Sequence, residues 1–183
     1  ELNDGGRLPG PFLYFLLAIP LFIQKSFESI AYFNFVLNLF SLVLIFFVIK
    51  RHFGFNTASV FFIFTSIYLP NINVFGCPIN PSFLFPFISI YIWALLEFFI
   101  KKRFNTFPII FLAVALGTQL HYSMATFYVA PILLSIIFRV KIPIKYIFIT
   151  LFSLILVFTP YFFYKFQTFI PAPSAPTSFQ ILK

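Results

Sequence analysis

The hydrophobic residues of this chain gather in seven long runs, and polar or charged residues separate one run from the next. Residues 35–49 are apolar at nearly every position, whereas a strand of a membrane barrel would alternate apolar with polar residues. A bilayer core about 30 Å thick takes roughly 20 helical residues per crossing, and several runs approach that length. The pattern therefore predicts helices over residues 11–23, 30–49, 57–69, 81–100, 106–120, 124–138 and 146–164.

The composition places these helices in a membrane. Hydrophobic residues make up 61% of the chain and charged residues 9%, and the mean hydropathy is +1.03. A soluble domain of 183 residues cannot bury that much apolar surface, so lipid must cover most of it. We expect an all-α, polytopic transmembrane helical bundle over residues 1–170, followed at 171–183 by a Pro- and Ser-rich outer tail or the start of a further loop.

The first run, residues 11–23, differs from the others. Its 13 residues are short for a crossing, and they include Pro20. We therefore expect about six spans from the later runs. The first helix is expected to lie along the outer interface or to re-enter the membrane, rather than to cross it.

The basic residues predict the orientation. Eight of the twelve Lys and Arg residues lie in short clusters between runs: Lys50, Arg51, Lys101, Lys102, Arg103, Arg139, Lys141 and Lys145. If each run from residue 30 onwards crosses once, all eight fall on the same side, and short basic loops favour the cytoplasm. The formal charge of +8 therefore indicates a multi-pass protein of the cytoplasmic (inner or plasma) membrane, with no nucleic-acid partner.

Familiar soluble-enzyme motifs are missing from the sequence, which has no G-x-G-x-x-G, G-x-x-x-x-G-K-[ST], H-E-x-x-H or G-x-S-x-G. Polar residues instead gather on the side predicted to be outside. They are Asp4, Arg7, Asn71, Asn73, Asn80, Gln119, His121 and Tyr122. Polar groups at a membrane boundary are typical of a water-filled cavity.

Three of these residues have side chains suited to chemistry. Asp4 could have a chemical role, as a general base or as a ligand of a divalent metal ion beside a phosphate. Its alternative role is structural, as the start of an Asx-Gly turn. Arg7 either pairs with a phosphate or anchors the chain at lipid headgroups. His121 either donates to a phosphate or shuttles a proton, or is an ordinary interfacial histidine.

Two further residues have simple structural explanations. Glu97 lies four residues before Lys101, and a helical ion pair at that spacing accounts for it. Cys77 is the single cysteine, which excludes an internal disulfide and a C-x-x-C motif.

Four stretches, taken in order, resemble the GT-C superfamily of membrane glycosyltransferases, in particular its protein O-mannosyltransferase and aminoarabinose-transferase branch. Residues 6–17 read Gly-Arg-Leu-Pro-Gly-Pro-Phe-Leu-Tyr-Phe-Leu-Leu, and residues 79–84 read Ile-Asn-Pro-Ser-Phe-Leu. Residues 116–123 and 159–164 read Leu-Gly-Thr-Gln-Leu-His-Tyr-Ser and Thr-Pro-Tyr-Phe-Phe-Tyr. The first stretch resembles the Pro-rich element that follows the first outer loop in this superfamily.

The resemblance implies an inverting transfer of a sugar from a polyprenyl-phosphate donor to an envelope glycan, lipid or protein acceptor on the outer face. It makes Asp4 the candidate catalytic base, and Arg7, Asn80, Gln119, His121 and Tyr122 the candidate substrate-binding residues. Many relatives place the catalytic Asp further before the Pro-rich element, so the base is either Asp4 or a residue upstream of it. Some relatives carry an acidic residue near Asn80, whose amide cannot act as a carboxylate base.

The chain is expected to be a piece of a longer protein, and two other functions remain open for it. A transporter or flippase for a lipid-linked or small substrate would use the same polar residues to line a path, but it would commonly carry charges at mid-membrane. A membrane scaffold would leave them merely interfacial. The cofactor is not determined, and a divalent metal ion stays an open option.

Overall fold

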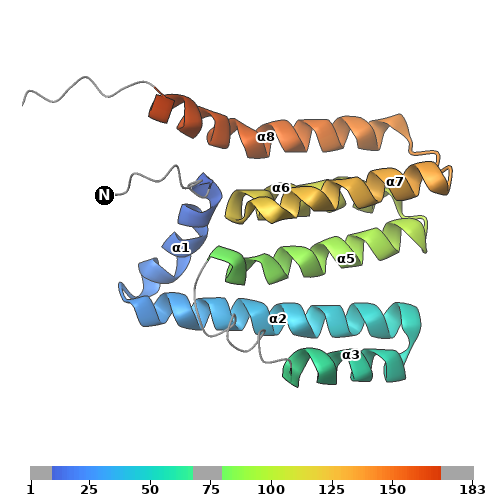
Figure 1. Cartoon of the computed structure of the whole chain (residues 1–183), viewed down its shortest axis with the longest axis horizontal. Coiled ribbons are helices and arrows are strands. Elements are labelled where there is room, and N and C mark those ends of the chain that lie inside the picture. Colours follow the sequence, from blue (N-terminus) through green and yellow to red (C-terminus); the bar gives the residue numbers. More distant parts are fainter. Residues whose placement is uncertain (1–9, 68–79, 170–183) are drawn as a thin grey trace, which may run out of the picture.

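The computed structural model describes residues 10–67 and 80–169, and every regular element within these ranges is helical (Figure 1). The α-helices are α1 (Pro11–Ile23), α2 (Phe27–Phe53), α3 (Phe55–Ile67), α5 (Phe85–Phe99), α6 (Phe107–Leu120), α7 (Val129–Ile137) and α8 (Ile144–Phe169). Short 3₁₀ helices lie at η1 (Asn80–Leu84), η2 (Phe104–Thr106) and η3 (Tyr122–Tyr128). The prediction of a helical membrane bundle is confirmed. Residues 171–183, predicted to form a tail or loop, lie outside the described residues.

The helix boundaries follow local sequence signals. α1 begins at Pro11, where the absence of a proline N–H has no cost, and it covers the predicted run 11–23. α2 starts three residues before its run because the Ser26 hydroxyl caps it, accepting from the Ser29 N–H at 3.3 Å. Gly54, with φ of 91°, ends α2 and allows the turn into α3. Pro160 does not end the last helix, because it lies inside α8, which continues to Phe169.

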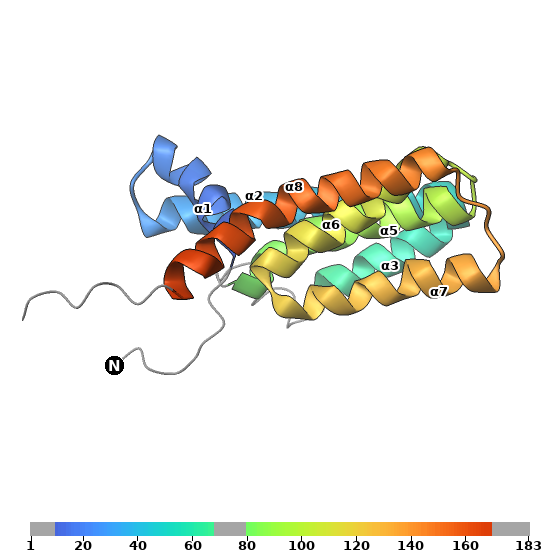
Figure 2. The same ribbon diagram turned by 90° about the horizontal axis from the view of Figure 1, so that it is seen from above.

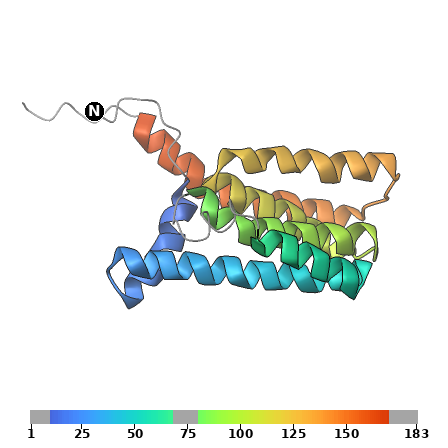
Figure 3. The ribbon, with the colours of Figure 1, turned by 60° about the horizontal axis from the view of Figure 1, so that its bottom comes forward.

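The helices fall into two orientations (Figures 1, 2 and 3). α2, α3, α5, α6, α7 and α8 extend along the long axis of the bundle, whereas α1 lies obliquely across the end at which α2 begins. This arrangement matches the expected interfacial or re-entrant first helix.

Three helical stretches in the described residues are long and apolar enough to cross a bilayer, by length and composition. They are Phe27–Phe53, Ser82–Phe99 and Ile144–Phe163. Shorter apolar helical stretches cover Phe55–Ile67, Phe104–Leu120 and Tyr122–Ile137. The expected number of about six spans therefore requires that these shorter stretches also cross.

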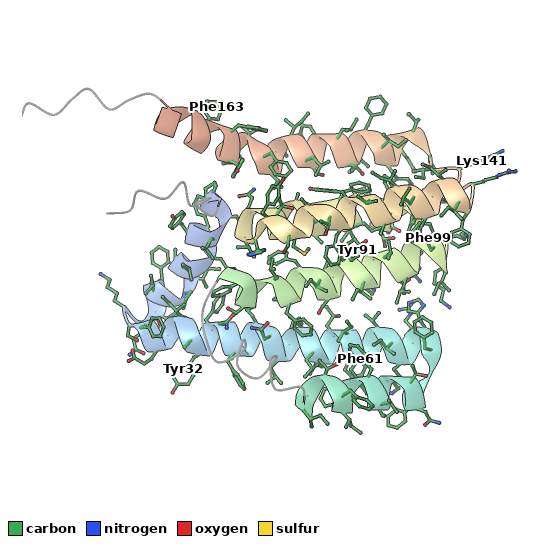
Figure 4. The ribbon with its side chains drawn as sticks, viewed as in Figure 1. Tyr32, Phe61, Tyr91, Phe99, Lys141 and Phe163 are labelled. Atoms are coloured by element: carbon green, nitrogen blue, oxygen red, sulfur yellow. The ribbon has the colours of Figure 1, made fainter. Side chains whose placement is uncertain are left out.

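The interior of the bundle lies mainly between α5 and α6. Tyr91, Ala94 and Phe98 of α5 pack there with Ile110 and Val114 of α6. By contrast, α8 is mostly unburied, and its surface carries exposed Phe rings such as Phe148, Phe152 and Phe163, the last labelled in Figure 4. Exposed apolar faces of this kind are suited to contact with lipid.

The three basic clusters lie at one end of the bundle. The three clusters occur at the end of α2, in the turn after α5, and between α7 and the first turn of α8. Figure 4 shows Lys141 and Phe99 at this end. We call it the basic end, and we call the opposite end, where α1 and the start of η3 lie, the polar end. The side of the membrane that each end faces remains a prediction.

Polar contacts fix α2 beside α5, and the two helices run in the same direction. Near the polar end, the Ser82 hydroxyl donates to Asn34 Oδ1 at 3.1 Å. At the basic end, the Glu97 carboxylate contacts Arg51 and His52 at 3.2 and 3.3 Å. Glu97 also contacts Arg103 at 3.0 Å, so the expected i,i+4 pair with Lys101 is replaced by pairs with residues of α2 and the following turn.

Candidate functional site

The candidate site lies at the polar end, where the start of α1 meets the end of α6. The Gly10 N–H donates to the Gln119 carbonyl oxygen at 2.7 Å. A Cβ at position 10 would lie 2.8 Å from Gln119 Cβ, which is closer than real Cβ contacts. Glycine at this position therefore lets the chain before α1 pass directly against the end of α6.

The Gln119 side chain joins three helices. Its Oε1 accepts from the Phe12 N–H at 3.2 Å, and its Nε2 donates to the Val157 carbonyl oxygen at 2.8 Å. The residue is only 4% exposed. Val157 lies three residues before Pro160, whose missing N–H removes the helical hydrogen bond to the neighbouring Leu156 carbonyl oxygen. The amide of Gln119 thus holds α1 and α8 against α6, which makes it a residue that positions the site.

His121 is the exposed polar side chain next to this junction. It ends α6 and caps η3, because its Nδ1 accepts from the Ser123 N–H at 3.3 Å. The Ser123 hydroxyl also lies 2.7 Å from Nδ1. With Nδ1 used as the acceptor, the neutral imidazole carries its proton on Nε2. His121 can therefore offer an Nε2–H donor at the surface of the polar end.

The remaining predicted site residues divide into two groups. Tyr122 begins η3 and is 66% exposed, so it lies beside His121 at the surface. Asn80 begins η1, which contacts α6. The fold thus brings four of the predicted residues to the same end of the bundle: Gln119, His121, Tyr122 and, by its backbone, Asn80. Asp4, Arg7, Asn71 and Asn73 lie outside the described residues.

A buried polar cluster on α2 supports this end and was missed by sequence reasoning. Asn38 Nδ2 donates to the Asn34 carbonyl oxygen at 2.9 Å and to Asn34 Oδ1 at 3.0 Å. The Ser82 hydroxyl donates to the same Oδ1, which ties η1 to α2. Asn34, Asn38 and Ser82 are each 0% exposed. Their signal in the sequence was two amides four residues apart inside an otherwise apolar run.

Among the described residues, no three His, Cys, Asp or Glu side chains lie close enough together to hold a metal ion. A narrow apolar cavity of about 180 Å³ lies beside Gln119, lined in part by Phe12, Leu156 and Pro160. At the surface of the described part of this end, His121, Ser123 and Tyr122 present polar side chains.

Comparison with known proteins identifies the family. The family model described as dolichyl-phosphate-mannose-protein mannosyltransferase matches residues 9–164, from just before α1 to within α8. Neither curated proteins nor solved structures gave a match. The family match covers all the described helices except the last residues of α8, and it agrees with the apolar helical bundle. The chain therefore belongs to the dolichyl-phosphate-mannose-protein mannosyltransferase family, a family of membrane glycosyltransferases.

Proposed function

We propose that this chain forms part of a multi-pass enzyme of the cytoplasmic membrane that transfers a sugar from a polyprenyl-phosphate donor to an envelope acceptor. The acceptor is a hydroxyl or amine of a glycan, lipid or protein on the outer face. Membership of the family supports glycosyl transfer in general. The separation of a basic end from a polar end supports the proposed side of the reaction, because basic loops favour the cytoplasm.

The reaction places two demands on the protein. The acceptor oxygen or nitrogen attacks the anomeric carbon while the bond from that carbon to the donor phosphate oxygen breaks, so the configuration inverts. A base must take the acceptor proton, and donors or cations must stabilise the departing polyprenyl phosphate anion. We assign the base to Asp4 or to a carboxylate upstream of it.

The observation that carries the proposal is the hydrogen bonding of His121. Its Nδ1 is occupied by Ser123, which leaves Nε2–H as the donor that the exposed imidazole can offer. A hydrogen bond from Nε2–H to a donor phosphate oxygen would strengthen as negative charge develops on the leaving group. His121 is therefore proposed to bind the phosphate.

We propose that Arg7 binds the same phosphate. Arg7 lies three residues before Gly10, a separation that spans at most about 11 Å of extended chain, and Gly10 is bonded to the end of α6. Its guanidinium can pair with two phosphate oxygens at once. We propose that Arg7 and His121 bind the phosphate together, and that Asn80 and Tyr122 hydrogen-bond the sugar. Gln119 contributes by positioning α1.

Substitutions at His121 test the proposal through sugar transfer by the complete protein. In His121→Asn, the Oδ1 atom can still cap η3, but the Nε2–H donor is lost. Because a hydrogen bond to a charged group contributes about 1.5–3 kcal/mol, kcat/KM should fall by about 10- to 100-fold at unchanged thermal stability. His121→Gln, whose amide N–H extends further, should recover part of this activity.

The assay is transfer of labelled sugar from a polyprenyl-phosphate donor in liposomes. Thr126→Ala, in the same 3₁₀ helix, is the control and should retain near wild-type activity, because its hydroxyl donates to a backbone group, the Ser123 carbonyl oxygen, at 2.8 Å. Unchanged transfer in His121→Asn would refute the phosphate-binding role. Movement of a lipid-linked substrate across the bilayer without sugar transfer would instead support a transporter or flippase.

A further inference from the structure

Glu97 gathers three basic side chains at the basic end of the bundle. Its carboxylate is 0% exposed, with Oε1 lying 3.2 Å from Arg51 Nε and 3.3 Å from His52 Nε2. Its Oε2 lies 3.0 Å from Arg103 Nη1. Arg51 and His52 come from the last turn of α2, whereas Arg103 follows α5. One buried carboxylate therefore holds two guanidinium groups from separate segments close to each other.

The backbone after α5 places Arg103 there. The N–H groups of Lys101 and Arg103 both donate to the Glu97 carbonyl oxygen, each at 3.2 Å. Between them, Lys102 has a φ of 56°, in the left-handed region that reverses the chain at the end of a helix. The turn therefore folds back over the end of α5, and the position of Arg103 is set by the backbone as well as by its ion pair.

The two guanidinium groups keep binding capacity after contacting Glu97. The Arg51 and Arg103 side chains are 50% and 53% exposed, and each meets the carboxylate through a single nitrogen. A guanidinium has five N–H donors, so most donors of both groups remain for another partner. Two positive charges share one negative charge, which leaves the pair net positive. A planar guanidinium can donate hydrogen bonds to two phosphate oxygens at once, and the net positive charge of the pair attracts a phosphate anion.

Exposed apolar side chains in the same two chain segments favour a lipid as the source of that phosphate. Phe53, two residues after Arg51, is 54% exposed, and Ile100, three residues before Arg103, is 49% exposed. A phospholipid carries, besides its phosphate, acyl chains that exposed apolar groups at this end of the bundle can contact. Basic pockets between transmembrane helices are known to bind anionic headgroups. We propose that Arg51 and Arg103, held by Glu97, form a binding site for the phosphate of an anionic phospholipid.

Binding to the complete protein in neutral detergent tests this site without reference to sugar transfer. The probes are short-chain phosphatidylglycerol, short-chain phosphatidylcholine and inorganic phosphate, with the bound fraction measured by native mass spectrometry. Phosphatidylglycerol should bind at least about tenfold more tightly than phosphatidylcholine, because only the former carries a net negative charge. Equal binding of the two lipids overturns the proposal, and so does binding of inorganic phosphate in place of phosphatidylglycerol.

Two variants with the same change in net charge test whether the lipid binds this site or the basic surface in general. The triple variant Arg51→Gln, Glu97→Gln, Arg103→Gln removes the pair without leaving a buried carboxylate unpaired, and its net charge falls by one. Lys101→Gln lowers the net charge by the same amount in the same turn. The triple variant should lose about 10- to 30-fold in affinity for phosphatidylglycerol, and Lys101→Gln less than about threefold. Equal losses overturn the proposal.

A milder pair of substitutions keeps the test decisive if the triple variant fails to fold. Arg51→Lys with Arg103→Lys retains both positive charges beside Glu97 but removes the planar donor forks. Affinity for phosphatidylglycerol should fall by about threefold or more. Unchanged affinity in this variant contradicts a site built from guanidinium groups.

Discussion

At the scale of single residues, Gln119 shows how one buried amide can set the geometry of an exposed site. Its side chain bonds the backbone of α1 and α8, at Phe12 and Val157, while its own carbonyl oxygen accepts from Gly10. These contacts hold the start of α1 against the segment that ends at His121. The sequence indicated a polar residue at this boundary, but it could not indicate that the amide faces inward.

Replacing Gln119 with Leu should destabilise the protein. The substitution leaves the Phe12 N–H without its side-chain acceptor, and an unpaired buried group costs about 1–3 kcal/mol. It also removes the side-chain donor of the Val157 carbonyl oxygen, which lies four residues before Tyr161 within the same helix. We expect the unfolding free energy in detergent micelles to fall by about 2 kcal/mol or more. Gln24→Leu, a matched change at an exposed amide, should alter it by less than about 0.5 kcal/mol. Equal effects of the two substitutions would contradict the role given to Gln119.

At the scale of elements, hydrophobic runs were a good guide to where helices lie. The run 11–23 coincides with α1. Within the described residues, the other runs lie in one helix or in a 3₁₀ helix and the α-helix that follows it, apart from single residues at their ends. The hydrophobic pattern predicted less well the helix boundaries that depend on capping or on long-range contacts. Ser26 starts α2 early, and α8 passes through Pro160. Glu97 was assigned a local partner because spacing along one helix cannot reveal a neighbour on another.

The parallel alignment of α2 and η1–α5 predicts energetic coupling between Asn34 and Ser82. A double-mutant cycle with Asn34→Leu and Ser82→Ala should give a coupling free energy of about 0.6 kcal/mol, up to about 1.7 kcal/mol, the range found for hydrogen bonds between membrane helices. Unfolding in mixed detergent micelles provides the measurement.

Ser41 supplies the control for this cycle, because its hydroxyl bonds the Leu37 carbonyl oxygen of its own helix at 2.6 Å. Pairing Ser41→Ala with Ser82→Ala should give a coupling energy near zero. A coupling between Asn34 and Ser82 that is no larger than this control would argue against the described register of the two elements.

At the scale of the whole molecule, the bundle has two chemically different ends. Spacing of the basic clusters predicted that they would share one end, and the order of the helices places them there. The opposite end carries His121, Tyr122 and the junction of α1 with α6. The sequence was enough to assign the site to one end, because the positions of the basic clusters and the number of helices between them determine which loops share an end. Its internal hydrogen bonds could not be predicted, because they join residues far apart in the sequence, such as Gly10 and Phe12 with Gln119.

The central claim is that the polar end faces the outside of the cell and the basic end faces the cytoplasm. It is tested most directly by labelling intact cells with a membrane-impermeant maleimide. In a Cys77→Ala background, Lys25→Cys introduces a thiol in the turn between α1 and α2, and Lys101→Cys introduces one in the turn after α5. Both positions are exposed. Labelling of Lys25→Cys in intact cells, with Lys101→Cys labelled only after permeabilisation, is the predicted result, and the reverse pattern would contradict the account.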